Sequence, residues 1–466
     1  MSRSSAFLLC ALIVSGCAVG PDFKKPDAQP PAAFRGDDGG QTNSLGDAPW
    51  AELFEDPALR ELIGTALTNN YDLRLAAARV EEARAVLAQS RSTLLPQASY
   101  QAGVGGGRNV VAGTPSYSGG PAGTEYEFAG SVSWEIDLWG RLRRLNESAR
   151  AQFLATEEAR RNVTVSLIAS VAGAYYQLLA LDKELSIAQA STNSFGRSLD
   201  IFSDRLRGGV ASKLETASAR ALLAAAAGAI PELRRQIAVQ ENQLRVLLGQ
   251  PPGPLAPGRA GLDDQRLPDV PPGLPSALLQ RRPDIRQAEQ LMRSANALVG
   301  VSKADFYPRL NLTALFGQVS PELSMLTSGA ANAWEAAGGL TGPIFQGGRL
   351  KGQLRQARAQ WEESRLQYQS TVLNAFREVA DALAAREELT LERAEQTKAV
   401  AAYREAVQVA NQRYLGGQAS YYELLQEQQQ LFPAETALAQ THLNQLLATV
   451  QLYKALGGGW AATKQP

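Results

Sequence analysis

Very few side chains in this sequence have types and spacings suited to catalysis or metal binding. The 466 residues contain one histidine, His442, which lies in a helical pattern with Leu443 and Leu446 and has no cysteine or second histidine to complete a metal site. The glycine-rich stretch 103–107 lacks the third glycine of a dinucleotide-binding loop, because Arg108 occupies that position. The sequence therefore predicts no enzyme, no cofactor and no metal site.

The N-terminus points to a different chemistry. Residues 1–16 carry a positive charge followed by a nine-residue apolar stretch, which is typical of an export signal and too short to span a bilayer. They lead into Val14-Ser-Gly-Cys17, which resembles a bacterial lipobox, where the cysteine thiol is acylated after cleavage. We expect Cys17 to carry lipid in the outer membrane, a destination favoured by Ala18. A plain signal peptide cleaved nearby is the alternative.

Composition narrows the possible partners. The 46 Lys and Arg residues equal the 46 Asp and Glu residues, and no basic run follows a phosphate backbone, so no nucleic-acid partner is expected. The sequence has two cysteines, and the first, Cys10, would leave with the signal. An exported chain with one cysteine has no disulfide framework, so its stability must come from packing or assembly.

The sequence contains two copies of one unit. Residues 207–215, Arg-Gly-Gly-Val-Ala-Ser-Lys-Leu-Glu, recur as residues 415–423, Leu-Gly-Gly-Gln-Ala-Ser-Tyr-Tyr-Glu. Further pairs recur in the same order: Asn70-Tyr-Asp with Arg282-Pro-Asp, Leu95-Pro96 with Tyr307-Pro308, Gly140-Arg-Leu142 with Gly348-Arg-Leu350, and Leu248-Gly249 with Leu456-Gly457. Several anchors in one order indicate an internal duplication.

These anchors predict the organisation of the chain. After the signal, an irregular tether covers 17–57, repeat 1 covers 58–248 and repeat 2 covers 276–457. A Pro/Gly-rich linker, 249–275, separates the repeats, and 458–466 form a C-terminal tail. We expect each repeat to contain a helix, a β-hairpin, a long helix and a returning helix.

A coiled-coil seam marks the long helix of each repeat. Apolar residues alternate spacings of four and three at Leu167, Val171, Ala174, Leu178, Leu181, Leu185, Ala188, Thr192, Phe195, Leu199, Phe202 and Leu206. The helical pattern covers 142–206, ~100 Å, and 350–414 has the same length. The charge-free stretch 163–181 has a transmembrane helix as its alternative interpretation, but the heptads continue past it, which favours a buried coiled-coil face.

Between residues 96 and 140 the hydrophobic period becomes two. Residues 125–138 alternate apolar with acidic or polar side chains, which predicts a strand with two different faces. Its partner strand is expected from Gln97 toward Gly105. In the second copy the expected strands contain Leu310, Leu312, Ala314 and Phe316, and then Trp334, Ala336, Leu340 and Ile344. The chain is therefore predicted to supply two hairpins.

Each long helix is expected to turn sharply into its returning helix. A glycine in the left-handed conformation ends the first helix, and a serine caps the next with a glutamate three residues on, forming a capping box. The residues expected in these roles are Gly208 and Gly416, Ser212 and Ser420, and Glu215 and Glu423. Pro231 and Pro433 predict kinks or breaks in the returning helices.

Four strands with such long helices attached cannot form a sandwich core or close a barrel alone. If the apolar faces contact lipid, a barrel without open edges needs strands from other copies of the chain, so a homo-oligomeric barrel follows. Trp139, Tyr307 and Phe345 lie at the helix-proximal ends of the strands, where an interfacial aromatic belt is expected. Scattered core aromatics are the alternative for these three residues.

Several motifs together resemble those of TolC-type outer-membrane efflux channels, in the lipoprotein branch that serves resistance-nodulation-division pumps. They are Cys17-Ala-Val-Gly-Pro-Asp-Phe-Lys-Lys-Pro26, Trp134-Glu-Ile-Asp-Leu-Trp-Gly-Arg141, Arg281-Arg-Pro-Asp-Ile285, Gly347-Gly-Arg349 and Arg413-Tyr414. The resemblance covers essentially the whole mature chain. It implies an α+β membrane protein: a homotrimeric twelve-stranded β-barrel, four strands per chain, continued by an α-helical coiled-coil tunnel. It also implies a periplasmic adaptor protein and an inner-membrane pump as partners.

The two turns are the expected gate and adaptor-docking residues: Arg205, Gly208, Gly209, Ser212, Glu215, Arg413, Tyr414, Gly416, Gly417, Ser420, Tyr421, Tyr422 and Glu423. Related channels often carry an aspartate at the position of Ala419, so this sequence departs from them. Glu423 is a candidate substitute, with helix capping as the alternative role. Tyr421 and Tyr422 are candidates to narrow the opening sterically. Arg205 and Arg413 are candidates to latch neighbouring helices through carboxylates.

The leading hypothesis is a passive exit duct that lets drugs or other toxic small molecules, expelled by an inner-membrane pump, leave through the outer membrane. Type I protein secretion is an alternative within the same class, because a tunnel does not record its cargo. A structural coiled-coil lipoprotein without a pore is the alternative from another class, but it would not need two alternating hairpins.

Overall fold

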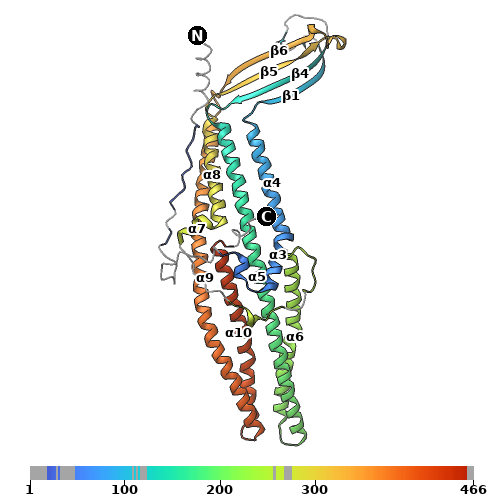
Figure 1. Cartoon of the computed structure of the whole chain (residues 1–466), viewed down its shortest axis with the longest axis vertical. Helices are drawn as coiled ribbons and strands as arrows, with labels where there is room; N and C mark the ends of the chain where they lie inside the picture. The colour runs from blue at the N-terminus through green and yellow to red at the C-terminus, as the bar shows by residue number, and fades with distance from the viewer. Residues whose placement is uncertain are drawn as a thin grey trace. The chain divides into compact units, whose positions relative to one another are not determined.

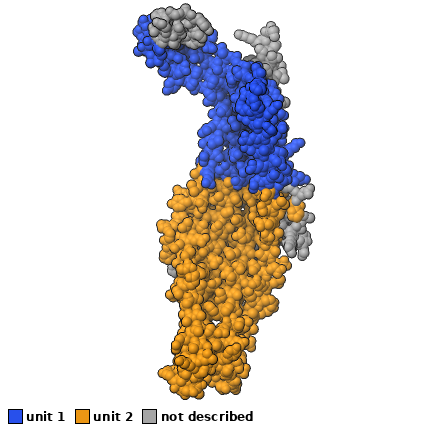
Figure 2. All heavy atoms as spheres, turned by 180° about the vertical axis from the view of Figure 1, so that it is seen from behind, with its two compact units in different colours: residues 1–27, 79–157, 287–369 blue, residues 28–78, 158–286, 370–466 orange. Residues whose placement is uncertain are grey.

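The computed structural model describes residues 18–27, 30–31, 48–107, 110–111, 114–115, 123–255, 259–266 and 275–458. The predicted signal peptide 1–16, the lipidation residue Cys17 and nearly all of the tail 458–466 lie outside these residues. The chain divides into two compact units (Figure 2): residues 1–27, 79–157 and 287–369 form unit 1, and residues 28–78, 158–286 and 370–466 form unit 2. The units do not follow chain order, because α4, α5, α8 and α9 each contribute residues to both.

The helices recur in a regular order along the chain. They are α2 (Trp50–Leu53), α3 (Pro57–Asn69), α4 (Tyr71–Ser92), α5 (Arg141–Arg207), α6 (Lys213–Leu247), α7 (Pro275–Arg281), α8 (Pro283–Ala304), α9 (Arg349–Leu415) and α10 (Tyr421–Ala455). The two long helices, α5 and α9, have 67 residues each, and each agrees with its predicted bounds to within one residue at both ends. Pro231 and Pro433 lie inside the continuous helices α6 and α10, so they do not break these helices, and the kinks that were the other expectation stay a prediction.

The core of unit 2 is built on the α5 seam. Val171, Leu178 and Ala188 are fully buried, whereas Leu206 at the end of the seam is 37% exposed. Among the described residues, α5 is the one helix long and apolar enough to cross a membrane, and 67% of its apolar window is buried inside the protein. This burial agrees with the coiled-coil interpretation of the charge-free stretch.

Unit 1 contains one antiparallel sheet of four strands in the order β1-β4-β5-β6 (Figure 1). The strands are β1 (Gln97–Gly107), β4 (Gly123–Ile136), β5 (Arg309–Ser320) and β6 (Asn332–Thr341), and β2 (Val110–Val111) pairs separately with β3 (Thr114–Pro115). Both predicted hairpins are confirmed. Ile344 was wrongly expected in the last strand, which ends at Thr341 because Pro343 cannot donate to the ladder.

The register places the large apolar side chains on one face of this sheet. Tyr100 is opposite Gly130, Trp134 is opposite Leu312, and Phe316 is opposite Trp334. Because side chains alternate along a strand, these pairings put nine exposed large apolar residues on the same face. They are Tyr100, Val104, Phe128, Val132, Trp134, Leu312, Phe316, Trp334 and Leu340. The opposite face carries the acidic residues Glu125, Glu127, Glu135 and Glu335.

Equivalent helix ends in unit 2 are held by different chemistry. The Asn70 side chain accepts the Leu73 amide at the start of α4 and donates to the Leu247 carbonyl at the end of α6, at 2.9 Å. Arg282 donates to the Ala455 carbonyl at the end of α10 at 3.0 Å. The buried Arg282 guanidinium also forms ion pairs with Asp284 at 2.6 Å and Glu378 at 2.8 Å. A neutral amide therefore binds the last carbonyl of α6, and a charged network binds the last carbonyl of α10.

The linker that was expected to be irregular contains one turn of 3-10 helix, η2 (Leu262–Asp264). Leu262 is only 2% exposed, so this turn is part of the core. Arg259, just before it, forms ion pairs with Asp182 of α5 at 2.9 Å and with Glu241 of α6 at 3.3 Å. The described residues 259–266 of the linker therefore pack on the helices of unit 2.

Replacing Gly317 by alanine is expected to destabilise the sheet by about 1–3 kcal/mol, the usual cost of overpacking. A Cβ at this position would lie 2.4 Å from the Phe128 carbonyl oxygen and 2.5 Å from the Ala129 Cα. Thermal unfolding of the detergent-solubilised protein, followed by circular dichroism, measures the effect. Gly339→Ala on β6 is the matched control, because no described atom lies within 4 Å of the added Cβ. Equal melting temperatures would contradict the close approach of β4 and β5.

Candidate functional site at the helical turns

The two predicted turns lie side by side in unit 2, at the lower end of Figure 1. Both end their long helix with the same backbone motif. In the first turn, residues 208–212, the Val210 amide donates to the Arg205 carbonyl and the Gly209 amide to the Leu206 carbonyl. In the second turn, residues 416–420, the Gln418 and Gly417 amides donate to the Arg413 and Tyr414 carbonyls. This double bond pattern is the Schellman motif, which satisfies the last carbonyls of a helix.

The glycine that takes the left-handed conformation is one residue later than predicted. Gly209 has φ of 74° and Gly417 has φ of 70°, whereas Gly208 and Gly416 do not have positive φ. The helix continues through Arg207 or Leu415, so the first glycine serves as the last residue of helical conformation. With two glycines in each turn, the hydrogen bonds of the motif select the second for the left-handed position.

The two turns differ in their side chains. Ser212 forms the predicted capping box: its hydroxyl accepts the Glu215 amide at 3.2 Å, and the Glu215 carboxylate accepts the Ser212 amide at 2.7 Å. Ser420 forms no side-chain cap, so the second predicted capping box is wrong. The Glu423 carboxylate instead lies 3.4 Å from the Arg413 guanidinium. The Glu423 carboxylate is therefore paired with Arg413 in the second turn, whereas Glu215 binds the backbone in the first.

Arg205, which is at the position equivalent to Arg413, does not repeat this ion pair. Its guanidinium lies 4.4 Å from the centre of the Tyr414 ring, a cation–π contact between α5 and α9. Among the described residues of this single chain no carboxylate ion pair is found for Arg205, and its part in the latch stays a prediction. The Arg413–Glu423 pair does join neighbouring helices, α9 and α10, and its latching role remains a prediction.

A buried aromatic cluster, which the sequence did not reveal, joins the two turns. Phe202 of α5 lies with its ring centre 3.7 Å from that of Tyr421 and 5.5 Å from that of Tyr414. These side chains are buried with Ala219, Ala410 and Leu424. Phe202 was visible in the sequence as a seam residue, but nothing local indicated that it would meet side chains from the second repeat.

The two tyrosines of the second turn have opposite surroundings. Tyr421 is only 2% exposed, so the expectation that it narrows an opening is wrong. Burial raises the pKa of Tyr421 to about 12, and its hydroxyl has no hydrogen-bond partner among the described residues. Tyr422 is 70% exposed and remains a candidate for that steric role. Ala211 and Ala419 leave the turns without a carboxylate at the position where related channels often carry one.

Four large apolar side chains are exposed at the turns. Val210 and Leu214 at the first turn are 81% and 76% exposed, and Leu415 and Tyr422 at the second are 55% and 70% exposed. Groups of large apolar side chains on a protein surface often mark a site where another molecule binds. The turns therefore carry exposed apolar side chains above a buried aromatic cluster.

The three aromatics expected at a membrane interface lie in unit 1. The Trp139 and Tyr307 rings stack with centres 4.8 Å apart, and the Trp139 indole donates to the Pro308 carbonyl at 2.7 Å. Phe345 is 88% exposed. Trp139 follows β4 and Tyr307 precedes β5, so both rings lie at the ends of these strands that are nearest the helices.

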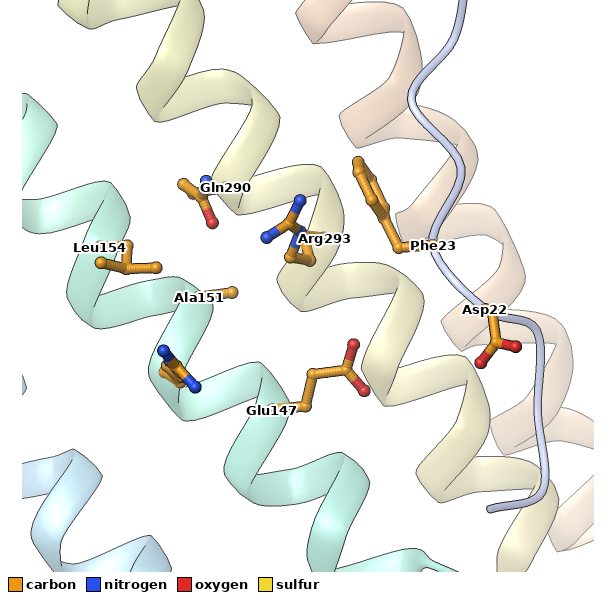
Figure 3. A pocket seen from close by; sticks show the side chains of 8 residues that line it. Asp22, Phe23, Glu147, Ala151, Leu154, Gln290 and Arg293 are labelled. Carbon is orange, nitrogen blue, oxygen red and sulfur yellow. The ribbon is translucent and has the colours of Figure 1, made fainter. Parts of the chain in front are cut away.

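The segment that follows Cys17 is extended and packs on unit 1. Asp22 pairs with Arg144 at 2.7 Å and Lys25 pairs with Glu289 at 2.6 Å. Beside it lies a pocket of about 480 Å³ between α5 and α8, which Figure 3 shows from close by. Its lining residues are Asp22, Phe23, Glu147, Arg150, Ala151, Leu154, Gln290 and Arg293. The start of the tether is therefore ordered by ion pairs with the helices.

His442 lies on α10 and is 2% exposed. Burial lowers its pKa to about 4, so the imidazole is neutral at neutral pH. Its Nδ1 lies 3.9 Å from the Asp263 carboxylate. In the parts of the chain that the structure describes, no group of three His, Cys, Asp or Glu residues could hold a metal ion.

Comparisons with known proteins agree with this architecture. The family described as outer membrane efflux protein matches residues 62–250 and 274–458. Over 459 residues the chain is 37% identical to the probable efflux pump outer membrane protein TtgC of Pseudomonas putida, covering 97% of this chain and 94% of the relative. It is 32% identical over 459 residues to the cation efflux system protein CusC of Escherichia coli, covering 97% of each.

A solved structure has the same fold. The open state of the MtrE outer membrane channel of Neisseria gonorrhoeae superposes with a TM-score of 0.86 at 31% identity, covering 95% of this chain and 99% of that one. A four-stranded sheet joined to two 67-residue helices is thus the fold of an outer-membrane channel protein. The chain belongs to the outer membrane efflux protein family, which is a family of efflux proteins and not of enzymes.

Ser212→Ala is expected to loosen the first turn by about 1 kcal/mol, the usual effect of removing an N-cap, whereas Ser420→Ala should have little effect. The difference follows because only Ser212 forms a side-chain cap. Amide hydrogen exchange read by mass spectrometry should show roughly fivefold faster exchange at residues 212–216 in the first variant. Equal acceleration in both variants would show that Ser420 also caps its helix.

Arg413→Glu is expected to raise the open probability of the channel by up to ~fivefold, because it replaces an attraction across α9 and α10 with repulsion from Glu423. Both side chains are about half exposed, which limits the effect. Single-channel recording in planar bilayers measures it. The double variant Arg413→Glu/Glu423→Arg restores opposite charges and should return to the original behaviour. Unchanged recordings for Arg413→Glu would rule out the latch.

Proposed function

We propose that three copies of this chain form the outer-membrane exit duct of a tripartite efflux pump. In this arrangement three four-stranded sheets close into one twelve-stranded barrel, and the paired helices form a coiled-coil tunnel in the periplasm. Drugs or other toxic small molecules expelled by an inner-membrane resistance-nodulation-division pump leave through this duct. The duct itself is passive, and the pump supplies the energy.

The sheet carries this proposal. Its nine large apolar residues occupy one face and its glutamates the other, which is the alternation of a barrel strand between lipid and water. Within the described chain, β1 and β6 each pair on one side only. Unpaired backbone groups are very costly in lipid, so β6 of one copy should pair with β1 of the next until the sheet closes.

The repeats, the signal peptide and the acylation of Cys17 are proposed from the sequence. We propose two repeats, 58–248 and 276–457, joined by the linker 249–275. Their equal helix lengths and the two separate stretches matched by the family support this duplication. The residues 1–16 would be removed and Cys17 acylated, and the contacts of Asp22 and Lys25 support a tether that starts close to the sheet.

The exposed apolar turns would dock a periplasmic adaptor protein that links the duct to its pump. Val210, Leu214 and Tyr422 provide the apolar surface for this contact. Trp139, Tyr307 and Phe345 would lie at the periplasmic interface of the outer membrane. The relatives above are efflux proteins, which supports small molecules as cargo in preference to secreted proteins.

The test is conductance of the full-length protein reconstituted into planar bilayers. We expect discrete, long-lived conductance steps from a particle whose mass by light scattering is that of three chains. The double substitution Phe316→Glu/Trp334→Glu places two charges opposite each other on the apolar face and should abolish insertion. A matched variant on the polar face, Glu335→Gln, should conduct. A monomer without conductance, prepared without denaturation, would overturn the proposal.

A further inference from the structure

An unassigned pocket lies between α5, α6 and α10 in unit 2, away from the turns. It encloses about 590 Å³ and is lined by Glu184, Ala229, Glu232, Leu233, Phe432, Pro433, Thr436, Ala437 and Gln440, which we call the Glu184 pocket. This volume is within the range of small-molecule sites, roughly 300–1,000 Å³. The short side chains of Ala229 and Ala437 leave this space between α6 and α10.

Five of the nine residues that line the Glu184 pocket are apolar. Leu233 and Phe432 belong to a hydrophobic cluster with Leu181 and Ala188 of α5. Pro433 contributes an apolar ring in place of an amide, so it adds no hydrogen-bond donor to the wall. A ligand for this pocket must therefore bury apolar groups, since these surfaces offer it little else to bind.

The charge lining the pocket is negative. Two carboxylates, Glu184 and Glu232, line it, and none of the lining residues is Lys, Arg or His. The Glu232 carboxylate is already neutralised, because Arg235 donates to it at 2.6 and 2.9 Å and Gln236 at 2.8 Å. These bonds lower the pKa of Glu232 to about 2. Glu232 therefore has little capacity left to bind a charged ligand.

Glu184 is the uncompensated charge. It is half buried on α5, and among the described residues it forms no ion pair and no side-chain hydrogen bond. Its neighbour in sequence, Lys183, turns away to pair with Asp263 at 2.6 Å. Burial raises the pKa of Glu184, which reports that its charged form lacks a compensating partner. One positive charge placed among apolar groups would complete this site.

We propose that the Glu184 pocket binds a monovalent lipophilic cation, that is, a molecule with one delocalised or quaternary positive charge surrounded by apolar groups. The cation faces the Glu184 carboxylate while its apolar groups contact Leu233, Phe432 and Pro433. This inference needs only the helical fold of the chain and does not rest on the proposed duct. Cargo, inhibitors and membrane-active cations could all supply this chemistry.

Two probes of the same shape and opposite charge test the proposal. Tetraphenylphosphonium and tetraphenylborate differ in the sign of their charge, so apolar burial alone should hold them equally. Binding to the full-length protein in detergent is measured by equilibrium dialysis against matched empty micelles, which removes partition into detergent. We expect the cation to bind at least ~tenfold more tightly than the anion. Equal binding of both probes, or saturable binding of neither, would overturn the proposal.

Glu184→Gln keeps the shape of the side chain and removes its charge. We expect it to weaken tetraphenylphosphonium binding by about tenfold and to leave tetraphenylborate unchanged or slightly tighter. Glu405→Gln, at an exposed position of α9, is the matched control and should bind both probes as the original protein does. Ala437→Phe fills the pocket and should abolish binding of both. Original cation affinity in Glu184→Gln would place the bound probe elsewhere and contradict the assignment.

The pH dependence gives an independent readout. Glu184 faces Glu232 and its partner Arg235 on α6, while the lining residues of α10 carry no titratable group. Cation binding should weaken as the pH falls through the raised pKa of Glu184, because the carboxylate becomes neutral. Glu184→Gln should lose this dependence. Conductance is recorded separately. A protein that conducts but does not bind the cation would refute the pocket alone. A protein that binds the cation but does not conduct would refute the duct alone.

Discussion

The structure depends on one constraint, which is that both edges of a four-stranded sheet must find partners. A single chain pairs β1 with β4, β4 with β5, and β5 with β6, and leaves the outer edges of β1 and β6 without partners in the described chain. With the apolar residues gathered on one face, such a sheet is stable neither in water nor alone in lipid. In the proposed trimer, pairing of β6 with β1 of the next copy would satisfy the edge groups, and lipid would cover the apolar face. The same hydrogen bonds would therefore determine membrane insertion, oligomer formation and a water-filled lumen.

Equivalent positions in the two halves of the chain share a backbone conformation but differ in side-chain chemistry. Both turns end in a Schellman motif with the second glycine left-handed, yet Arg205 contacts an aromatic ring and Arg413 a carboxylate. Asn70 and Arg282 both bind the last carbonyls of a returning helix, one as a neutral amide and one within a buried charge network. Backbone geometry is shared because it sets helix direction. Side-chain chemistry is free to diverge because each turn has different neighbours.

The limits of sequence-based prediction follow from the same distinction. Periodicity located α5 and α9 to within one residue at each end, and the strands of the hairpins with larger errors at their ends, because it is a property of each segment and of the face it buries. The capping residues could be predicted only where no other group competed. Ser420 makes no side-chain cap and the Glu423 carboxylate lies beside Arg413, a contact that depends on how α9 and α10 meet. Tyr421 was misjudged for the same reason, since Phe202 buries it from 219 positions earlier in the chain. Glu184 gave no sequence signal, because the other residues that line its pocket come from two other helices, α6 and α10.

The contacts at the two turns differ in how much free energy they contribute. Moving one helical hairpin of the chain away from the other would expose Phe202 and Tyr421, at a cost of roughly 1.5–3 kcal/mol for each fully buried side chain. The half-exposed Arg413–Glu423 pair joins α9 to α10 within the second hairpin and contributes about 1 kcal/mol at most there, so it does not hold the two hairpins to each other. The aromatic cluster therefore sets the larger part of the energy that holds the two hairpins of one chain together. Contacts made only by exposed side chains, such as Tyr422 and Val210, remain available to a partner, because a partner can engage them without disturbing that cluster.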